Sequence, residues 1–494
     1  MDHGAGYRDL ARLGRPSLRG APHDDRELRQ GPEVTGGIGD GSIVTLGCGA
    51  AGEPDNPRLA QEMVEHGGAR YVCYDNLAER TLAFAQLRKA ANPGEGHSPL
   101  LRERMRLALA PAQERGVKLL GSFGGANPHR AGEIVLEEAT AAGLDAICVG
   151  VVTGDDVFAP LTSGDLDLTF WETGGGLDTL PGTVVSAQAY LGSTPILSAL
   201  QAGADVVVTG RVSDLSPYLA VLRHEFGWDP ADDGLMAAGA VVGHLLECGR
   251  YLTGGFFAEP AYGVDVPDLA ALALPLAEVE ADGSAVLTKP KGSGGYVTVG
   301  TCKAQLLYEV QDPAAYLNPD VTIDLREVRF EQEGPDRVRM TGALGRPRPE
   351  LLKVSVGVDQ GWRAEGEVSF AGPGSLEKAE QSIAIVEKRL QKYGAVADDY
   401  RADLIGVNSI HGPASRPGQP PYEVRLRMAA RFPSEEEAEI FRRECDDLWF
   451  GTGGAGGVRT SLTQALAIFS TSVERDLVHP LVEVTNWQRQ EATP

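Results

Sequence analysis

Cysteine, aromatic residues and long apolar runs are all scarce in this chain of 494 residues. Aromatic residues make up 6% of the sequence, and the six cysteines are scattered without a Cys-x-x-Cys pair. No apolar run approaches the roughly 18 residues of a membrane-spanning helix, and no apolar signal-peptide segment opens the chain. We therefore expect a cytoplasmic protein whose thiols are buried and reduced rather than joined in disulfides.

Positive charge is also in short supply. The chain has 45 lysines and arginines against 69 acidic residues, which gives a formal net charge of −24. Such a surface repels phosphodiester backbones and anionic membranes, so we expect neither nucleic acid nor membrane as a partner. A small anionic substrate stays compatible with this charge, because the N-terminus of a helix can bind an anion locally.

Motifs of several common reaction types are missing as well. The sequence has no Gly-x-Ser-x-Gly turn, no Cys/His catalytic signature and no zinc-finger spacing, so nothing favours nucleophilic hydrolysis, and we assign no metal ligand. A Gly-x-Gly-x-x-Gly pattern does occur at residues 47–52, but Pro54 and Pro57 interrupt the helix that should follow it. We interpret it as a tight turn rather than a dinucleotide site, and we predict no specific cofactor.

Glycine is abundant, with 62 residues, and apolar β-branched runs repeatedly end at it. Such runs alternate with helical patterns along the first half of the chain. This alternation predicts an α/β fold with a mostly parallel, Rossmann-like sheet and helices on both faces. The expected parallel strands are residues 43–46, 71–74, 117–120, 146–152 and 204–209.

The pattern changes near residue 266 to runs of short strands with a few helices, which predicts a second domain of α+β type. Its expected strands include residues 285–289, 296–301, 328–333, 337–341 and 352–358. We divide the chain into an N-terminal arm at 1–40, either mobile or draped over a neighbour, the Rossmann-like domain at 41–265, the α+β domain at 266–480 and a C-terminal tail at 481–494.

Charged residues follow two of the expected parallel strands. Asp155 and Asp156 come after one strand, and Arg211 and Asp214 come after another, while Asp75 ends a third. Because ligands of open α/β sheets bind at the carboxyl ends of the strands, we expect these residues to share one crevice. Asp156 or Asp214 could act as a base and Arg211 could hold an anion. For Asp155 and Asp156 the alternatives are the binding of a divalent cation or a simple capping role.

His244 and Glu247 stand one helical turn apart, close enough to interact. Such a pair could relay protons, with Glu247 as a base and His244 as an acid, or ligate a metal. No third ligand is spaced with them, and a satisfied helical histidine is an equally good interpretation.

Two glycine-rich loops could contact the substrate. Asn127 follows a Gly-Gly-Ala stretch and can orient a carbonyl or carboxylate, although a glycine-permitted turn explains the loop equally well. Lys289, Ser293 and Gly294 lie in a loop of cations and glycines that suits a phosphate or a CoA moiety. This loop lacks the order of a P-loop.

A series of motifs in one order connects these candidates. The motifs are Tyr74-Asp-Asn-Leu-Ala-Glu-Arg-Thr81, Gly125-Ala-Asn-Pro128, Val152-Thr-Gly-Asp-Asp-Val157, Thr209-Gly-Arg-Val-Ser-Asp214, Gly243-His-Leu-Leu-Glu-Cys-Gly249, Thr253-Gly-Gly-Phe256, Ser284-Ala-Val-Leu-Thr-Lys-Pro290, Gln305-Leu-Leu-Tyr-Glu-Val310 and Phe370-Ala-Gly-Pro-Gly374. The chain thereby resembles the core region of the acyclic terpene utilisation (AtuA) family. Longer members carry an extra C-terminal domain that has no counterpart here, and Asp75 stands where the family tends to show Glu.

The resemblance implies an enzyme of lyase or hydratase type that acts on a small carboxylate or a branched acyl-CoA at an interdomain cleft. CoA would enter as part of the substrate, and we expect a homo-oligomer. Two other functions stay open from the residues. One is a nucleotide- or CoA-dependent ligase or transferase using the 289–295 loop, and the other is a non-catalytic scaffold subunit of a carboxylase or biosynthetic complex.

Overall fold

The computed structural model describes residues 43–164, 166, 168–415, 418, 421–452 and 455–489. The arm expected at residues 1–40 lies outside this part of the chain. Within it, no helix combines the length and apolar character needed to cross a membrane.

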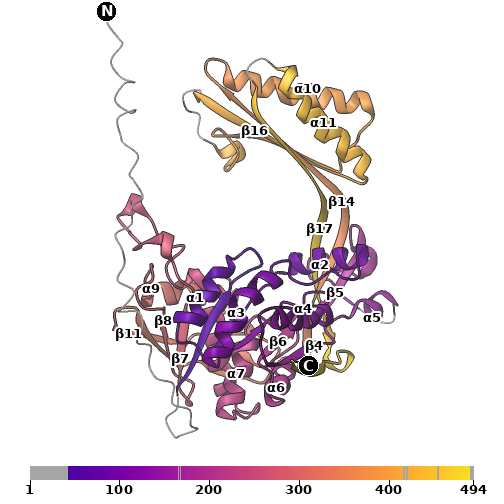
Figure 1. Cartoon of the computed structure of the whole chain (residues 1–494). Coiled ribbons are helices and arrows are strands. Elements are labelled where there is room, and N and C mark those ends of the chain that lie inside the picture. The colour runs from indigo at the N-terminus through magenta and orange to yellow at the C-terminus, as the bar shows by residue number, and fades with distance from the viewer. Residues whose placement is uncertain are drawn as a thin grey trace, which may run out of the picture. The chain divides into compact units, whose positions relative to one another are not determined.

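The main sheet of the described chain has ten strands, and five neighbouring strands at its centre run parallel (Figure 1). These five, β1, β2, β3, β6 and β4, are the five strands predicted from the sequence. Antiparallel strands flank them on both sides. In sheet order the strands are β11 (Arg329–Gly334), β12 (Arg337–Thr341), β8 (Ala285–Thr288), β7 (Leu276–Val279), β1 (Val44–Ala50), β2 (Tyr71–Tyr74), β3 (Lys118–Gly121), β6 (Val206–Thr209), β4 (Ala146–Thr153) and β18 (Leu481–Gln488).

Helices cover both faces of this sheet, as predicted. Alternate residues of β2 show this, because Tyr71 and Cys73 join one apolar core while Val72 and Tyr74 join the other. The first core contains side chains of α6, α7 and α8, and the second contains side chains of α1, α3 and α4. The helices of this body are α1 (Pro57–His66), α2 (Glu79–Ala91), α3 (Leu101–Arg115), α4 (Pro128–Ala141), α5 (Phe158–Thr162), α6 (Thr194–Gln201), α7 (Ser216–Phe226), α8 (Asp233–Glu247) and α9 (Val299–Leu307). The fold class predicted from the sequence is therefore confirmed.

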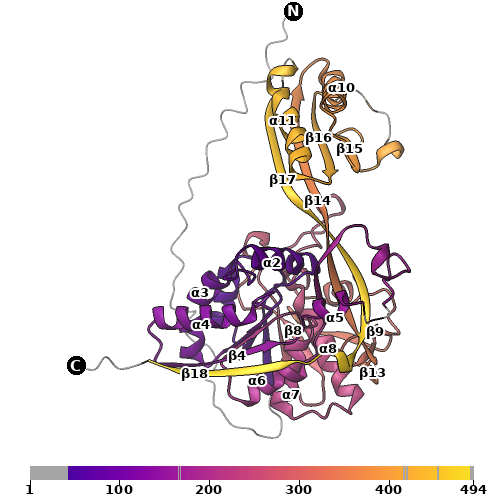
Figure 2. The same ribbon diagram turned by 90° about the vertical axis from the view of Figure 1, so that its right-hand side faces the viewer.

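A very long strand, β14 (Leu351–Ala371), links this body to a further layer (Figure 2). Its first half pairs with β5 (Thr183–Ala189), and its second half pairs with β16 (Glu423–Phe432). Strand β17 (Gly456–Glu474) accompanies β14 along both halves, and β15 (Asp399–Ile405) completes the sheet. Helices α10 (Ser375–Tyr393) and α11 (Glu435–Gly451) pack on it and enclose a third apolar core.

A small three-stranded sheet packs beside α8. Its strands are β13 (Leu344–Arg346), β10 (Thr322–Asp324) and β9 (Tyr316–Leu317).

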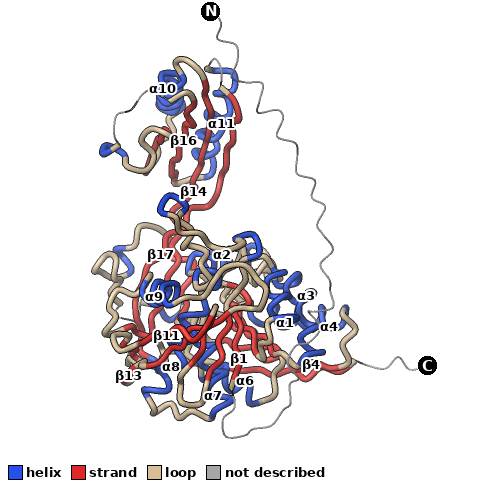
Figure 3. Tube along the Cα trace, turned by 90° about the vertical axis from the view of Figure 1, so that its left-hand side faces the viewer, coloured by secondary structure: helices blue, strands red, loops and turns tan. Residues whose placement is uncertain are grey.

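The strand predicted at residues 296–301 is wrong, because helix α9 begins there (Figure 3). Thr298 and Thr301 form a reciprocal capping box: each side-chain oxygen accepts a hydrogen bond from the other residue's backbone N–H. These bonds satisfy backbone donors at the start of a helix and outweigh the alternating Tyr-Val-Thr-Val pattern.

Strands on both sides of the boundary expected at 265/266 belong to one sheet, since β7 pairs with β1 and leads to β8, β12 and β11. The segment interpreted as a tail contains β18, which pairs with β4 over eight residues (Figure 2).

Candidate active site

Three carboxylates meet at the carboxyl ends of the parallel strands. Asp75 directly follows β2, and Asp214 lies in the loop that leads from β6 to α7. Glu247 is the last residue of α8, a helix that is buried without interruption from Met236 to Glu247. One oxygen atom of each carboxylate lies within 4.8 Å of the other two.

A second group of side chains shares Glu247. The imidazole Nδ1 of His244 lies 3.4 Å from Glu247 Oε1 and 3.5 Å from Glu309 Oε1. Glu309 follows α9, which packs against α8, and Gln305 of α9 donates a hydrogen bond of 2.9 Å to the carbonyl of His244. We call Asp75, Asp214, Glu247 and Glu309 the acidic cluster.

Arg211 supplies positive charge beside this cluster. It is 1% exposed, and its guanidinium donates to Asp214 and to the backbone carbonyls of Leu77 and Val212. Its charged end lies 4.4 Å from the ring centre of Tyr190, a cation–π contact. Arg211 thereby fixes the carboxylate of Asp214 in a low-dielectric environment.

Burial raises the pKa values of three of these carboxyl groups, those of Asp75, Asp214 and Glu247. It raises the pKa of Asp75 well above its usual value, helped by the charge of Asp214, and it does the same for Glu247 beside Asp214 and Glu309. Burial also raises the pKa of Asp214, but the charge and hydrogen bond of Arg211 oppose this shift. Asp214 is therefore the carboxyl that has a cation in direct contact to keep it ionised.

The surroundings of His244 favour the neutral form of its imidazole. Burial lowers its pKa, although Glu309 and the carbonyl of Leu306 oppose that shift. His244 is 0% exposed, whereas the side chains of Asp214 and Glu309 are 34% and 40% exposed. The open side of the cluster is therefore formed by Asp214 and Glu309.

Asp155 and Asp156, which were expected in the same crevice, make other contacts. Asp155 is buried and accepts a hydrogen bond of 2.8 Å from the backbone N–H of Arg211, so it positions the loop that carries Arg211. Burial raises its pKa to about 6. Asp156 is exposed and accepts a hydrogen bond from the backbone N–H of Phe158 at the start of α5. This bond closes a local turn just before α5, as is common for an aspartate that follows a strand.

The side chains singled out in the two glycine-rich loops also form hydrogen bonds and an ion pair within the protein. Asn127 donates hydrogen bonds to the carbonyls of Pro93 and Glu95 and holds that loop in place. Lys289 donates to the carbonyl of Ser293 at 2.7 Å and pairs with Asp336 at 3.2 Å. The side chain of Ser293 donates to a carbonyl of the same loop, and Gly294 approaches the carbonyl of Asp268 so closely that a Cβ atom would lie 2.0 Å from it.

The structure adds residues that the sequence analysis did not single out. Glu309 stands next to the end of a motif that was noted only as a whole, and its place in that motif is the one signal for it in the sequence. Glu79 accepts hydrogen bonds from Tyr190 at 2.5 Å and from Lys353 at 3.1 Å. These contacts join α2, β5 and β14 next to Arg211.

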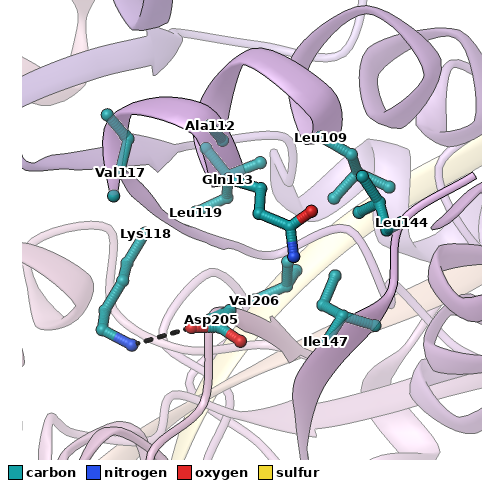
Figure 4. A pocket seen from close by; sticks show the side chains of 11 residues that line it. Leu109, Ala112, Gln113, Val117, Lys118, Leu119, Leu144, Ile147, Asp205 and Val206 are labelled. Carbon is teal, nitrogen blue, oxygen red and sulfur yellow. Dashed lines mark hydrogen bonds and ion pairs between the residues drawn. The ribbon is translucent and has the colours of Figure 1, made fainter. Parts of the chain in front are cut away.

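A pocket of about 270 Å³ opens at the opposite, amino ends of β3, β4 and β6 (Figure 4). It is lined by apolar side chains together with Gln113 and the ion pair between Lys118 and Asp205. None of the predicted site residues lines it. It is therefore a largely apolar hollow whose two charged side chains are paired with each other.

Comparison with known proteins gives one match. The sequence profile of the family described as acyclic terpene utilisation family protein AtuA matches residues 44–484. No curated protein and no solved structure matches the chain. The matched span includes the acidic cluster, His244 and Arg211, and it runs from β1 into β18. The chain therefore belongs to the acyclic terpene utilisation (AtuA) family.

Proposed function

We propose that this AtuA family protein is an enzyme of lyase or hydratase type that acts on a small carboxylate or a branched acyl-CoA. One observation carries the proposal: Asp75, Asp214 and Glu247 come from three separate elements and converge beside the buried Arg211. Carboxyl groups brought together in this way acquire different proton affinities, as acid–base catalysis requires.

The roles follow from the contacts. Asp214, held by Arg211, is the base that removes the proton next to the substrate carbonyl. Asp75, whose pKa burial and Asp214 raise, is the acid that donates a proton to the leaving oxygen at the β carbon. The C–O bond breaks, water leaves and a C=C bond forms, while hydration is the same sequence in reverse. The exposed edge at Asp214 admits the substrate.

This assignment is tested by proton exchange and product formation. Purified protein in D₂O is mixed with branched 3-hydroxyacyl-CoA and 3-hydroxy acid candidates, and NMR follows deuterium at the α carbon and the appearance of the alkene. We expect Asp214→Asn and Asp75→Asn each to lower turnover by about 10²-fold or more. Asp145→Asn, an exposed aspartate just before β4 at the other end of the strands, serves as the control that keeps full turnover.

Folded Asp214→Asn and Asp75→Asn proteins that turn over as fast as the parent would refute these roles. The rival ligase or transferase function needs the lysines of the 289–295 loop, Lys289 and Lys291, to hold a phosphate. Lys289 is already paired with Asp336 and the carbonyl of Ser293, which favours the lyase or hydratase reaction. Thermal stabilisation by ATP would favour the rival.

The cytoplasm is the proposed location, because all six cysteines are free thiols and five of them are buried. The homo-oligomer expected from the sequence stays a prediction.

A further inference from the structure

We propose that His244, Glu247 and Glu309 form a binding site for one divalent transition-metal cation. The proposal rests on the geometry of these three side chains. It does not depend on the lyase or hydratase reaction, and its test measures binding alone.

The histidine presents a lone pair to the two carboxylates. Its Nε2 atom lies 3.1 Å from the carbonyl oxygen of Leu306, and a carbonyl can only accept, so Nε2 carries the proton. In a neutral imidazole the other nitrogen, Nδ1, is then unprotonated. This Nδ1 is fully buried and has no hydrogen-bond partner in the described part of the chain. It faces Glu247 and Glu309.

The spacing of the donor atoms fits a common coordination sphere. Ligands placed about 2.1 Å from a tetrahedral ion lie about 3.4 Å from one another. The distances from His244 Nδ1 to Glu247 Oε1 and Glu309 Oε1 are 3.4 Å and 3.5 Å. A backbone carbonyl that accepts the second ring N–H, here that of Leu306, is the usual way in which a metal-binding histidine is oriented.

The negative charge of Glu247 and Glu309 favours a bound cation. Of the four carboxyl groups in the acidic cluster, Asp214 is paired with Arg211. Glu247 and Glu309 instead face each other and the buried Nδ1 atom of His244, which has no hydrogen-bond partner in the described part of the chain. Either a proton shared between the two glutamates or a bound dication removes this repulsion, and a dication also satisfies the nitrogen lone pair.

The donor set indicates the class of ion. One imidazole and two carboxylates suit Zn²⁺, Mn²⁺, Fe²⁺ or Co²⁺, whereas Mg²⁺ and Ca²⁺ prefer oxygen ligands alone. The side chain of Glu309 is 40% exposed, so the site has a solvent side through which an ion can enter.

The experiment uses the full chain after dialysis against a chelator. Co²⁺ and Mn²⁺ are titrated separately, with calorimetry for affinity and stoichiometry, and the visible absorption of Co²⁺ reports nitrogen and oxygen ligation. We expect one ion per chain, and at least 10-fold weaker binding in Glu309→Gln. Glu331→Gln, which removes the same charge from an exposed position on β11, should bind as the parent does.

Two results would overturn the proposal. One is equal affinity of the parent, Glu309→Gln and Glu331→Gln for both ions, and the other is the absence of binding by a folded parent chain. His244→Gln tests the nitrogen ligand, and it should remove the Co²⁺ absorption band. If this buried variant does not fold, Glu309→Gln at the open edge still decides the question. Because no substrate is present, a failed turnover assay leaves this result unaffected.

Discussion

Arg211 shows how one buried cation organises the surrounding carboxyl groups. It replaces the water that Asp214 would otherwise bind, and its remaining donors are tied to backbone carbonyls of Leu77 and Val212. A lysine could not reproduce these contacts, because its three donors diverge from one atom and do not form a planar fork. The backbone N–H of Arg211 is itself held by Asp155. Asp155 therefore contributes to the site by positioning the loop.

The carboxyl group of Glu79 leads to a prediction of how the stability of the protein depends on pH. Burial alone would raise its pKa, but hydrogen bonds from Tyr190 and Lys353 outweigh burial and lower the pKa from 4.5 to about 2. A carboxyl whose pKa is lower in the folded state stabilises the protein above pH 4.5, and this stabilisation is lost as the pH falls towards 2. We expect Glu79→Gln to cost roughly 1–2 kcal/mol at pH 7, discounted for partial exposure, and less at pH 3.

Urea unfolding at pH 7 and pH 3 measures this difference. Glu377→Gln is the matched control, because Glu377 also lies in the first turn of a helix, α10, and therefore shares the helix-dipole contribution. Its substitution should cost a few tenths of a kcal/mol. A destabilisation by Glu79→Gln that is as large at pH 3 as at pH 7 would contradict the lowered pKa.

Part of the site was predictable residue by residue. Asp75, Arg211 and Asp214 were found because strand ends can be recognised from apolar runs that stop at glycine or polar residues. His244 and Glu247 were found because helical spacing brings them together. Glu309 was not found, because only the packing of α9 against α8 places it there, and the first residues of α9 were interpreted as a strand.

At the scale of elements, β14 belongs to two cores. Val354, Val356 and Val358 lie in the core of the main body, while Val368 and Phe370 lie in the core under α10 and α11. The pairing of β14 with β17 is irregular between Asp359 and Trp362, where the strand passes from one core to the other. At this point Gly361 has φ +90°.

Gly361 therefore provides a test of how the two halves are joined. An added Cβ atom would lie 2.2 Å from the carbonyl oxygen of Phe432, the last residue of β16. We expect Gly361→Ala to destabilise the protein by about 2–4 kcal/mol, through strain at positive φ and this clash. Hydrogen exchange should show the loss of protection in β16, α10 and α11 and little change in β1, β2 and β3.

Gly372→Ala is the control that separates the clash with Phe432 from the backbone strain at positive φ. Gly372 has φ +81° but open space around its Cα atom, so its substitution should cost only about 1–2 kcal/mol. Equal effects of the two substitutions would show that the contact with β16 is unimportant.

The predictability of the elements follows from where their signals lie. The five parallel strands are buried on both faces, so they appear as continuous apolar runs bounded by glycine, and all five were predicted. Strand β18 has an alternating burial pattern without a fully buried residue, and polar and apolar residues are mixed along it. Its place in the sheet is set by pairing with β4, which lies more than 300 residues earlier in the chain. Local sequence patterns cannot reveal a pairing over that distance.

At the scale of the whole molecule, the acidic cluster is built from four distant stretches of sequence. Asp75 and Asp214 follow strands of the parallel sheet. Glu247 and Glu309 lie at or just after the ends of α8 and α9. The sheet brings Asp75 and Asp214 together because all parallel strands present their carboxyl ends at one edge. The helices complete the cluster through long-range packing, which is why its geometry became visible only in the fold.

The net charge of −24 determines how the stability of the whole protein should respond to salt. Repulsion among like charges opposes the folded state, and salt that shortens the screening length from about 30 Å at 0.01 M to about 8 Å at 0.15 M weakens it. We expect the Tm at pH 8 to rise when NaCl increases over this range. Near the isoelectric point of about 4.8 the net repulsion vanishes, and salt then screens mainly attractive ion pairs such as Arg337 with Glu278.

The Tm should therefore stay constant or fall with the same addition of NaCl at pH 5. Thermal unfolding followed by intrinsic fluorescence at both pH values measures the two slopes. The same rise at pH 5 as at pH 8 would mean that salt acts by a route other than screening the net charge. If the Tm rises with NaCl only at pH 8, repulsion among the negative charges lowers the stability of the folded protein.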